Sequence, residues 1–140
     1  EFYPLFEAKP HVFIQIGHPL AKKKSVTLDD LHPYPYLSFE QGEFNSFYFS
    51  EEILSTVSRP KNIKVSDRAT LFNLLIGLNG YTISTGVISQ ELNKNICSIP
   101  LEVDETMTVG YIVHKHITTS KLTTIYINYL KETIEAELNV

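Results

Sequence analysis

The stretch NIKVSDRATLFNLLIGLNGYTIS, residues 62–84, places a helical pattern between two short apolar segments. The segments at 62–65 and 81–84 are rich in β-branched and aromatic residues, which favours strands. Asp67 is placed to cap the start of the helix, and Gly80 to take the left-handed conformation after its end. The leucines between them follow the i, i+3, i+4, i+7 spacing of one helix face: Leu71, Leu74, Leu75 and Leu78. The stretch therefore predicts a strand–helix–strand unit.

The same alternation continues outward on both sides of this stretch. A short helix is predicted after Thr27, because Thr27 and Asp30 fit a capping box and Pro33 stops the helix. Further strands are expected at residues 11–16, 36–39, 96–99 and 107–114, and further helices at residues 45–57, at residues 87–92 and after Ser120. Strands that alternate with helices predict an α/β fold with mostly parallel sheets.

Composition narrows the class of protein. The chain has 140 residues, 43% of them hydrophobic and 20% charged, which suits one globular domain. Its formal net charge of −4 argues against a chain that attracts nucleic acid as a whole. Apolar runs fall short of the roughly 20 residues that cross a bilayer, and residues 1–10 lack the layout of a signal peptide. Together with the single cysteine, Cys97, these features predict a cytoplasmic protein with no membrane association.

Motifs of catalysis and metal binding are absent from the sequence. It has no G-x-S-x-G elbow, phosphate-binding loop, dinucleotide fingerprint or H-E-x-x-H pair. His114 and His116 could share a strand face as metal ligands, but a third ligand is not indicated, so surface histidines are the favoured interpretation. Cys97 lies in an apolar segment, which favours a buried, inert thiol. We therefore expect no metal, no cofactor and no catalysis.

Polar side chains do follow three of the predicted strands. Ligands of open parallel sheets bind at the carboxyl ends of strands, near helix starts. Such residues also simply cap helices, which is the competing interpretation. The candidates are Phe39, Glu40, Gln41, Gly42, Asn45 and Ser46 at and beyond the end of the first of these strands, Ser66, Asp67 and Asn73 beyond the second, and Ser84, Thr85 and Gly86 at and beyond the end of the third. They suit a small polar or anionic ligand.

Five segments of the sequence stand in a characteristic order: HPLA at 18–21, TLDDL at 27–31, PYPYLSFEQG at 33–42, DRATLFNLLIGLNGYTIS at 67–84 and HITTSKLTTIYINYLKETI at 116–134. This order resembles the effector-binding domain of LysR-type transcriptional regulators, and the resemblance covers almost the whole chain. It departs from the family pattern at Asn79, where a glycine-rich turn is usual, and at Ser84–Thr85, where an apolar residue and proline are common.

This resemblance implies a type 2 periplasmic-binding-protein-like domain of two Rossmann-like subdomains, the first of them incomplete. Residues 37–106 would form the second subdomain, and residues 1–36 and 107–140 the remnant of the first. Two crossover strands, near 34–40 and 105–112, would hinge them. The family's winged helix-turn-helix has no counterpart in this chain, so any contact with DNA would need a domain outside it.

The resemblance also implies a ligand site and partners. A small effector would bind between the subdomains and shift their relation, and the domain would form a homodimer or a higher oligomer. Asn73 matches the family's polar position in the helix before the glycine turn, and residues 39–45 match the loop after the crossover strand. A Ser/Thr-bearing helix start that completes the family's pocket has no match here.

Two other classes of function share the α/β architecture. One is a substrate-binding protein of a transporter, which an export signal in the full gene would favour. The other is an enzyme that uses Ser84 or Cys97 as its nucleophile. Turnover of an ester or amide that is lost on Ser84→Ala or Cys97→Ala would favour the enzyme.

Overall fold

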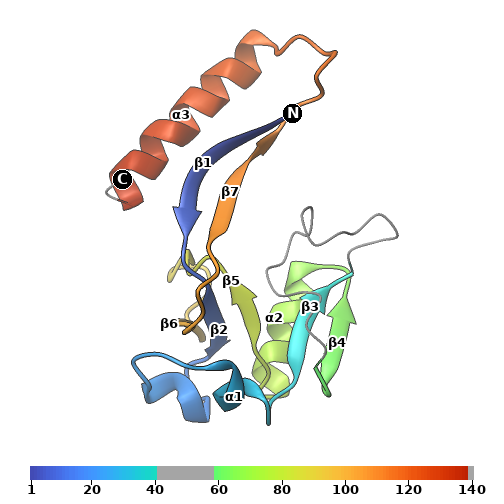
Figure 1. Ribbon diagram of the computed structural model, residues 1–140, viewed down its shortest axis with the longest axis vertical. Coiled ribbons are helices and arrows are strands. Elements are labelled where there is room, and N and C mark those ends of the chain that lie inside the picture. The colour runs from blue at the N-terminus through green and yellow to red at the C-terminus, as the bar shows by residue number, and fades with distance from the viewer. Residues whose placement is uncertain (41–58, 139–140) are drawn as a thin grey trace. The chain divides into compact units, whose positions relative to one another are not determined.

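The computed structural model describes residues 1–40 and 59–138, which form two compact units (Figure 1). Unit 1 comprises residues 1–8 and 108–140, and unit 2 comprises residues 9–107. The predicted helix at 45–57 lies outside the described residues.

The strands of unit 2 form two ladders. β2 (His11–Gln15) lies between β5 (Thr82–Ser84) and β6 (Ile96–Pro100) and is antiparallel to both. β3 (Tyr36–Phe39) pairs in parallel with β4 (Asn62–Val65). The prediction of mostly parallel strands is therefore correct for β3 and β4 and wrong for β2.

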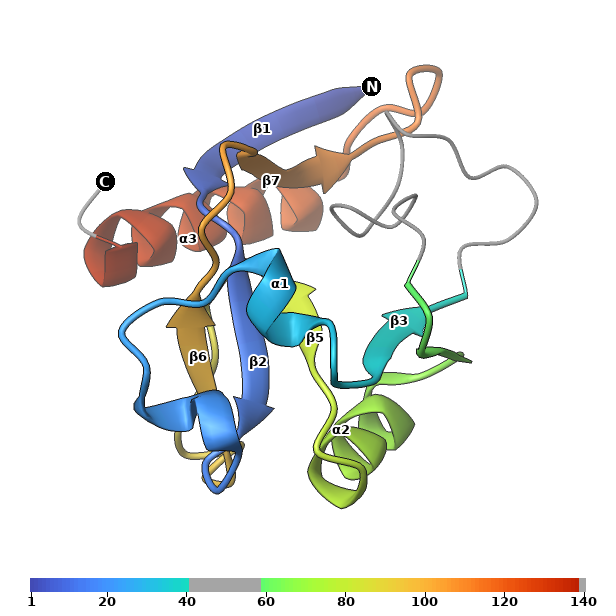
Figure 2. The ribbon, with the colours of Figure 1, turned by 60° about the horizontal axis from the view of Figure 1, so that its bottom comes forward.

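Backbone hydrogen bonds join the two ladders at a parallel bridge between Tyr36 and Tyr81. The Leu37 N–H donates to the Tyr81 carbonyl at 2.8 Å, and the Tyr81 N–H donates to the Pro35 carbonyl at 3.0 Å. β3 and β5 consequently run in the same direction side by side. Figure 2 shows β6, β2, β5 and β3 following one another across the unit.

The direction of β2 follows from the path of the chain. β2 opens unit 2, and β6 leads back out of it, with His11 opposite Pro100 in the ladder. Beyond the ladder, the Leu101 N–H donates to the Pro10 carbonyl at 3.0 Å. Two segments that bring the chain in and out at one end of a unit must run in opposite directions when they pair.

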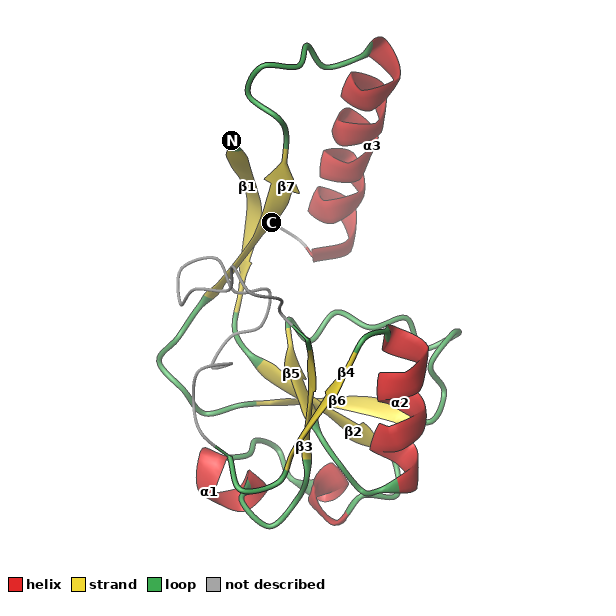
Figure 3. Ribbon diagram, turned by 90° about the vertical axis from the view of Figure 1, so that its right-hand side faces the viewer, coloured by secondary structure: helices red, strands yellow, loops and turns green. Residues whose placement is uncertain are grey.

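β2 is buried on both faces because successive side chains of a strand point to opposite sides. Val12 and Ile14 join a first cluster, which packs against α1 (Leu28–Leu31) and η1 (Pro19–Lys22). Phe13 joins a second cluster, which packs against α2 (Arg68–Gly77). α1 and α2 accordingly lie on opposite sides of the strands (Figure 3). This explains the unbroken apolar run of the strand.

The two clusters are made of buried side chains that come from all parts of unit 2. The first cluster comprises Val12, Ile14, Leu20, Val26, Leu31, Tyr36, Tyr81, Ile83, Ile99 and Leu101. The second cluster comprises Phe13, Leu37, Val65, Leu71, Leu75 and Ile96.

The predicted helix caps of unit 2 are confirmed. The Asp30 N–H donates to the Thr27 hydroxyl at 3.2 Å, and the Thr27 N–H donates to the Asp30 carboxylate at 3.0 Å, which completes the capping box. Asp67 caps α2, where its carboxylate accepts the Thr70 N–H at 2.8 Å. Sequence alone placed both helix starts because a cap depends on residues within one turn.

The end of α2 differs from the prediction. Asn79, with φ of 51°, takes the left-handed conformation that was predicted for Gly80. The Gly80 N–H donates to the Leu75 carbonyl at 3.2 Å, which closes the turn. Gly80 is needed for space, since a Cβ there would lie 2.7 Å from Leu37 Cδ1. Asparagine tolerates this conformation better than most residues do.

The predicted helix at 87–92 is wrong. These residues form a turn-rich connection between β5 and β6, in which the Asn93 N–H donates to the Ser89 carbonyl at 3.0 Å. Leu92 is 85% exposed, so no core contact fixes an apolar face. A helix of six residues is too short to form without such packing.

Unit 1 contains β1 (Phe2–Ala8), most of β7 (Met107–Ile112) and α3 (Lys121–Leu138). β1 and β7 pair and run in opposite directions (Figure 1). The amino group of Glu1 donates to the Val113 carbonyl at 2.8 Å. β1 was not predicted, because Pro4 interrupts its strand pattern. Among the described residues β1 pairs only with β7, and proline is tolerated in such edge strands.

α3 begins as predicted, with the Thr123 N–H donating to the Ser120 hydroxyl at 3.1 Å. No residue of α3 among 121–138 is buried, and Leu122 and Tyr129 are 78% and 69% exposed. The described part of the chain has no helix that is both long and apolar enough to span a membrane.

The units divide the chain differently from the predicted subdomains at one point. Their second boundary, between residues 107 and 108, lies one residue from the predicted position. Their first boundary lies between Ala8 and Lys9 and not between residues 36 and 37, because residues 9–36 supply β2, η1 and α1 to the core of unit 2.

Candidate ligand-binding site

The carboxyl ends of β3, β4 and β5 lie at one edge of unit 2 (Figure 1). Phe39 is opposite Val65 in the parallel ladder, and the Glu40 N–H extends that ladder by donating to the Val65 carbonyl at 2.9 Å. β5 runs in the same direction and ends at Ser84. Six candidates therefore lie at or directly after neighbouring strand ends: Phe39, Glu40, Ser66, Asp67, Ser84 and Thr85.

The remaining candidates are not part of this edge as described. Gln41, Gly42, Asn45 and Ser46 lie outside the described residues. Asn73 lies within α2 and is exposed, whereas Leu71 and Leu75 on either side of it are buried. Helical spacing thus places Asn73 on the face of α2 that points away from the strands. Its role in ligand binding stays a prediction.

Asp67 places a negative charge at the start of α2. Its carboxylate accepts the Thr70 N–H at 2.8 Å and the Thr70 hydroxyl at 2.7 Å. These bonds hold the pKa of Asp67 below its usual value of 3.8 and keep it ionised at neutral pH. The carboxylate uses the helix start that an anionic ligand would otherwise occupy.

The turn after β5 presents two hydroxyl groups. Ser84 and Thr85 are half-buried, and the Thr85 hydroxyl accepts the Val87 N–H at 3.3 Å. Gly86 has φ of 85°, and a Cβ at this position would lie 2.6 Å from Cγ of His11. Only glycine lets the turn approach the histidine ring this closely.

His11 connects that turn to the point where the chain enters unit 2. Its Nδ1 lies 2.8 Å from the Lys9 carbonyl and donates to it, since a carbonyl only accepts. Lys9 is the first residue of unit 2. This contact could not be predicted from the sequence, because it depends on the pairing of β2 with β5.

His18 of the HPLA segment has a structural role. It is buried, its Nδ1 accepts the Leu20 N–H at 3.1 Å, and its Nε2–H donates to the Asn79 carbonyl at 3.1 Å. Its ring centroid lies 4.3 Å from that of Tyr34. Burial lowers the pKa of His18 below 6.5, against the opposing effect of the bond to Asn79. His18 therefore ties η1 to the end of α2 as a neutral imidazole.

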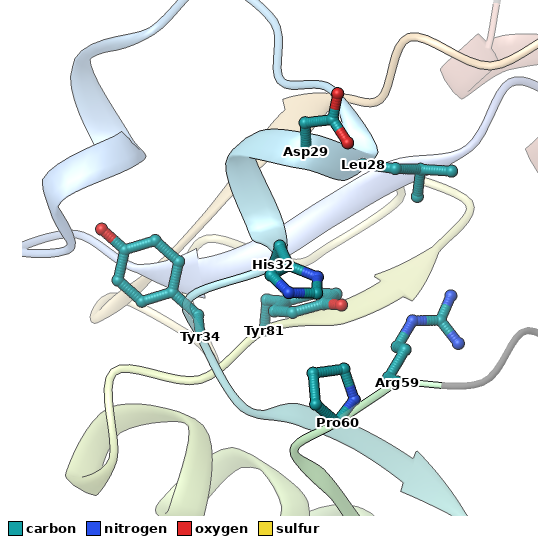
Figure 4. A pocket seen from close by; sticks show the side chains of 7 residues that line it. All are labelled: Leu28, Asp29, His32, Tyr34, Arg59, Pro60 and Tyr81. Atoms are coloured by element: carbon teal, nitrogen blue, oxygen red, sulfur yellow. The ribbon is translucent and has the colours of Figure 1, made fainter.

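A pocket of about 140 Å³ lies elsewhere on unit 2 (Figure 4). The Arg59 guanidinium lies 3.9 Å from the ring centroid of Tyr36. Burial raises the pKa of Tyr81, and the charge of Arg59 opposes this rise. Within the described part of the chain, it is lined by Leu28, Asp29, His32, Tyr34, Arg59, Pro60 and Tyr81. Sequence reasoning missed this pocket, because residues distant in sequence line it.

Groups suited to metal binding or catalysis are not assembled in the described part of the chain. No cluster of three or more His, Cys, Asp or Glu residues occurs in residues 1–40 and 59–138. Burial raises the pKa of the half-buried Cys97 thiol, which disfavours the reactive thiolate. Ser84 is opposite His11 in the ladder, but no hydrogen bond joins their side chains within these residues.

No family model and no curated protein matches the sequence, whereas solved structures match the fold. The effector-binding domain of QuiR in complex with shikimate has a TM-score of 0.65 and 20% identity, over 98% of this chain and 66% of that one. The BenM effector-binding domain with its effector benzoate has a TM-score of 0.64 and 18% identity, over 99% of this chain and 64% of that one.

A third match is HinK, a LysR-family transcriptional regulator from Pseudomonas aeruginosa. It has a TM-score of 0.65 and 18% identity, over 96% of this chain and 47% of that one. This chain thus spans about half to two thirds of the length of the structures it matches. It has the fold that these LysR-family effector-binding domains share.

Proposed function

We propose that this chain is the ligand-sensing part of a LysR-type transcriptional regulator and has no catalytic activity of its own. One observation carries the proposal. The fold is that of effector-binding domains, two of which hold shikimate and benzoate, and the polar strand ends of β3, β4 and β5 meet at one edge. The HPLA, TLDDL and PYPYLSFEQG segments support the same assignment.

The effector is a small polar or anionic metabolite. Shikimate and benzoate are both carboxylates, and hydroxyl groups are suitable donors to a carboxylate. Ser84 and Thr85 provide two such groups at the end of β5. The ionised Asp67 would repel a carboxylate, so the negative end of the effector lies toward Thr85 and away from the start of α2.

Ligand binding acts on the rest of the protein through the start of unit 2. Gly86 packs against His11, which bonds to Lys9, where the chain passes from unit 1 into unit 2. A ligand that moves the Ser84–Gly86 turn would change this contact. It would favour one relation of two subdomains over another, which is the free-energy difference that regulation requires.

The partners of the whole regulator follow from this assignment. Unit 1 is part of a first subdomain, and unit 2 is the second. DNA is bound in the cytoplasm by a helix-turn-helix domain outside this chain. The protein forms homodimers or larger oligomers, and the exposed apolar side chains of α3 are available for contacts of this kind. A monomer at every concentration in a light-scattering series would contradict the oligomer.

A thermal-shift screen of small carboxylates tests the ligand site. A bound effector raises the unfolding temperature, by mass action. The rise is expected to be lost in the double variant Ser84→Ala and Thr85→Ala. The matched control is Thr106→Ala, which removes a hydroxyl from an exposed loop residue of the same unit. The proposed site is wrong if the double variant responds like the control.

A further inference from the structure

The side chain of His11 lies on the same side of the strands as that of Ser84. The two residues are opposite each other in the antiparallel ladder of β2 and β5, so their Cβ atoms are about 5 Å apart and point to one face. Phe13, two residues after His11, points to that face too and belongs to the second cluster, which packs against α2. His11 is therefore part of the edge at which β3, β4 and β5 end, on the side of α2.

One ring nitrogen of His11 is committed to the backbone. Nδ1 lies 2.8 Å from the Lys9 carbonyl oxygen, and a carbonyl only accepts hydrogen bonds, so Nδ1 carries the proton. In a neutral imidazole the other nitrogen, Nε2, then has a lone pair and no proton. The bond to Lys9 thus determines what Nε2 can bind, which is a group that donates a hydrogen bond.

Nε2 of His11 is accessible to a ligand. Within residues 1–40 and 59–138 it has no hydrogen-bond partner, and it is not among the buried polar atoms that lack one. Gly86 packs against the ring, because a Cβ at this position would lie 2.6 Å from Cγ and 2.7 Å from Nδ1 of His11. The bond to Lys9 and this contact together fix the position of an acceptor that a ligand can reach.

The neighbouring hydroxyl groups can donate where a neutral His11 can only accept. The Thr85 hydroxyl accepts the Val87 N–H at 3.3 Å, which leaves its own proton for another acceptor. The Ser84 hydroxyl has no hydrogen-bond partner in the described part of the chain. Hydroxyl protons suit a carboxylate, whereas Nε2 and a carboxylate are both acceptors and repel each other. The edge thus presents donors for a carboxylate beside an acceptor for a hydroxyl.

This arrangement suits a ligand with two different polar ends. We propose that His11 selects effectors that are hydroxycarboxylates. Its Nε2 accepts a hydrogen bond from a hydroxyl of the ligand, while Ser84 and Thr85 donate to the carboxylate. The proposal rests on the proposed function, because it concerns the same effector. A carboxylate without a hydroxyl leaves Nε2 unpaired in the complex, which lowers its affinity.

Shikimate and cyclohexene carboxylate are the probes, because they share a ring and a carboxylate and differ in the hydroxyl groups. Each is titrated into the chain at about pH 8, where histidine side chains are ordinarily neutral, and followed by the backbone amide signals in NMR. Both acids should shift the signals of Ser84 and Thr85. Shikimate should bind roughly tenfold more tightly, since it alone donates to Nε2.

His11→Asn removes Nε2 and keeps an N–H that can donate to the Lys9 carbonyl, because the side-chain amide of asparagine takes the place of Nδ1. This variant should lose the preference for shikimate and bind cyclohexene carboxylate as the unaltered chain does. The matched control is His32→Asn, which changes an exposed histidine that precedes β3, at the other end of the strands. The control should keep the preference.

A measurement on the unaltered chain covers the case in which His11→Asn does not fold. The nitrogen signals of the His11 ring in NMR report which nitrogen carries the proton. We expect the proton on Nδ1, both in the free chain and in the shikimate complex. A proton on Nε2 in either sample would overturn the proposal.

The other outcomes separate this proposal from the proposed effector site. Equal affinity for the two acids, with shifts at Ser84 and Thr85, would exclude selection by His11 and leave the effector site intact. The same preference in His11→Asn as in His32→Asn would also exclude it. No shift at Ser84 and Thr85 with either acid would contradict the effector site, and this proposal with it.

Discussion

Unit 2 and unit 1 use the same kinds of elements and bury them to very different extents. In unit 2, α2 packs Leu71 and Leu75 into the second cluster, with 1% and 0% exposure. In unit 1, the longer helix α3 has no buried residue among 121–138. Unit 2 therefore has a hydrophobic core on each side of its strands. Unit 1 consists of a pair of strands and a helix that has no buried residue among 121–138.

The difference shows what an amphipathic pattern does and does not determine. Both helices have apolar residues at helical spacing, and both form where the sequence predicts them. α2 also carries Phe72 and Ile76 outside its buried face. The stripe of α3 comprises Leu122, Ile125, Tyr126, Tyr129, Leu130 and Ile134. An apolar stripe indicates which face of a helix would be buried. That face is buried only where another element packs against it. We infer that unit 2 carries most of the stability of this chain.

The sharpest test compares one leucine from each unit. Leu75→Ala should lower the free energy of unfolding by about 2–5 kcal/mol, because it removes a fully buried side chain and leaves a cavity. Leu122→Ala should change it by no more than about 0.5 kcal/mol, because Leu122 is 78% exposed. Urea denaturation measures both. Equal losses in the two variants would show that the stability is not concentrated in unit 2.

A smaller effect is expected from the turn after α2. Gly80→Ala should cost about 1–3 kcal/mol, because its Cβ would lie 2.7 Å from Leu37 Cδ1 and 3.0 Å from the Pro35 carbonyl oxygen. The control is Gly77→Ala, at the last residue of α2. A Cβ there meets nothing within 4 Å, so this change should stabilise by up to about 1 kcal/mol. The same sign for both variants in thermal unfolding would refute the explanation from close approach.

The loss of one helix cap in each unit gives a smaller comparison, because a cap contributes about 1 kcal/mol to stability. Thr27→Ala removes one half of the capping box of α1 and should lower the stability of unit 2 by about that amount. Ser120→Ala removes the equivalent bond at the start of α3. It should lower amide-exchange protection in α3 alone, and leave the unfolding of unit 2 unchanged. A shared loss would mean that the units unfold as one.

The smallest effect depends on pH. The pKa of His18 is lowered by burial, so the unfolded state binds a proton there before the folded state does as the pH falls below 6.5. Unfolding free energy should therefore fall as the pH is lowered from 7.5 toward 5. The lowered pKa values of Asp30 and Asp67 act in the same direction but only below 3.8. An unchanged pH slope between 7.5 and 5 in His18→Gln would exclude His18 as the cause.

Local features were the predictable part of the fold. Strand positions followed from β-branched runs, and the caps at Thr27, Asp67 and Ser120 followed from side chains within one turn of the helix start. The errors arose where tertiary packing outweighed local sequence preference. β1 was not predicted because Pro4 interrupts its strand pattern, and the helix predicted at 87–92 did not form because these residues have no surface to pack against. The direction of β2 depends on partners some 70 to 90 residues away, which no local pattern records.

The candidate site was predictable to the extent that it depends on strand ends. The parallel direction of β3, β4 and β5 brings Glu40 and Ser84 to one edge, as the α/β rule implies. Asn73 shows the limit, because its position relative to the glycine turn gave no information about which face of α2 it occupies. The pocket lined by Arg59 could not be predicted from the sequence. Arg59 comes close to Tyr36 and Tyr81 only in the folded chain, where the strands pair.

The two-sided burial of β2 has a consequence for how the sequence can change in length. Inserting one residue before Val12 would turn every following side chain of the strand to the other side. Phe13 would then face α1, and Ile14 would face α2. Both cores would fail together, although no apolar residue had been lost. The three exposed lysines at 22–24, by contrast, should accept an insertion. Natural variation in length should therefore concentrate after η1 and avoid β2.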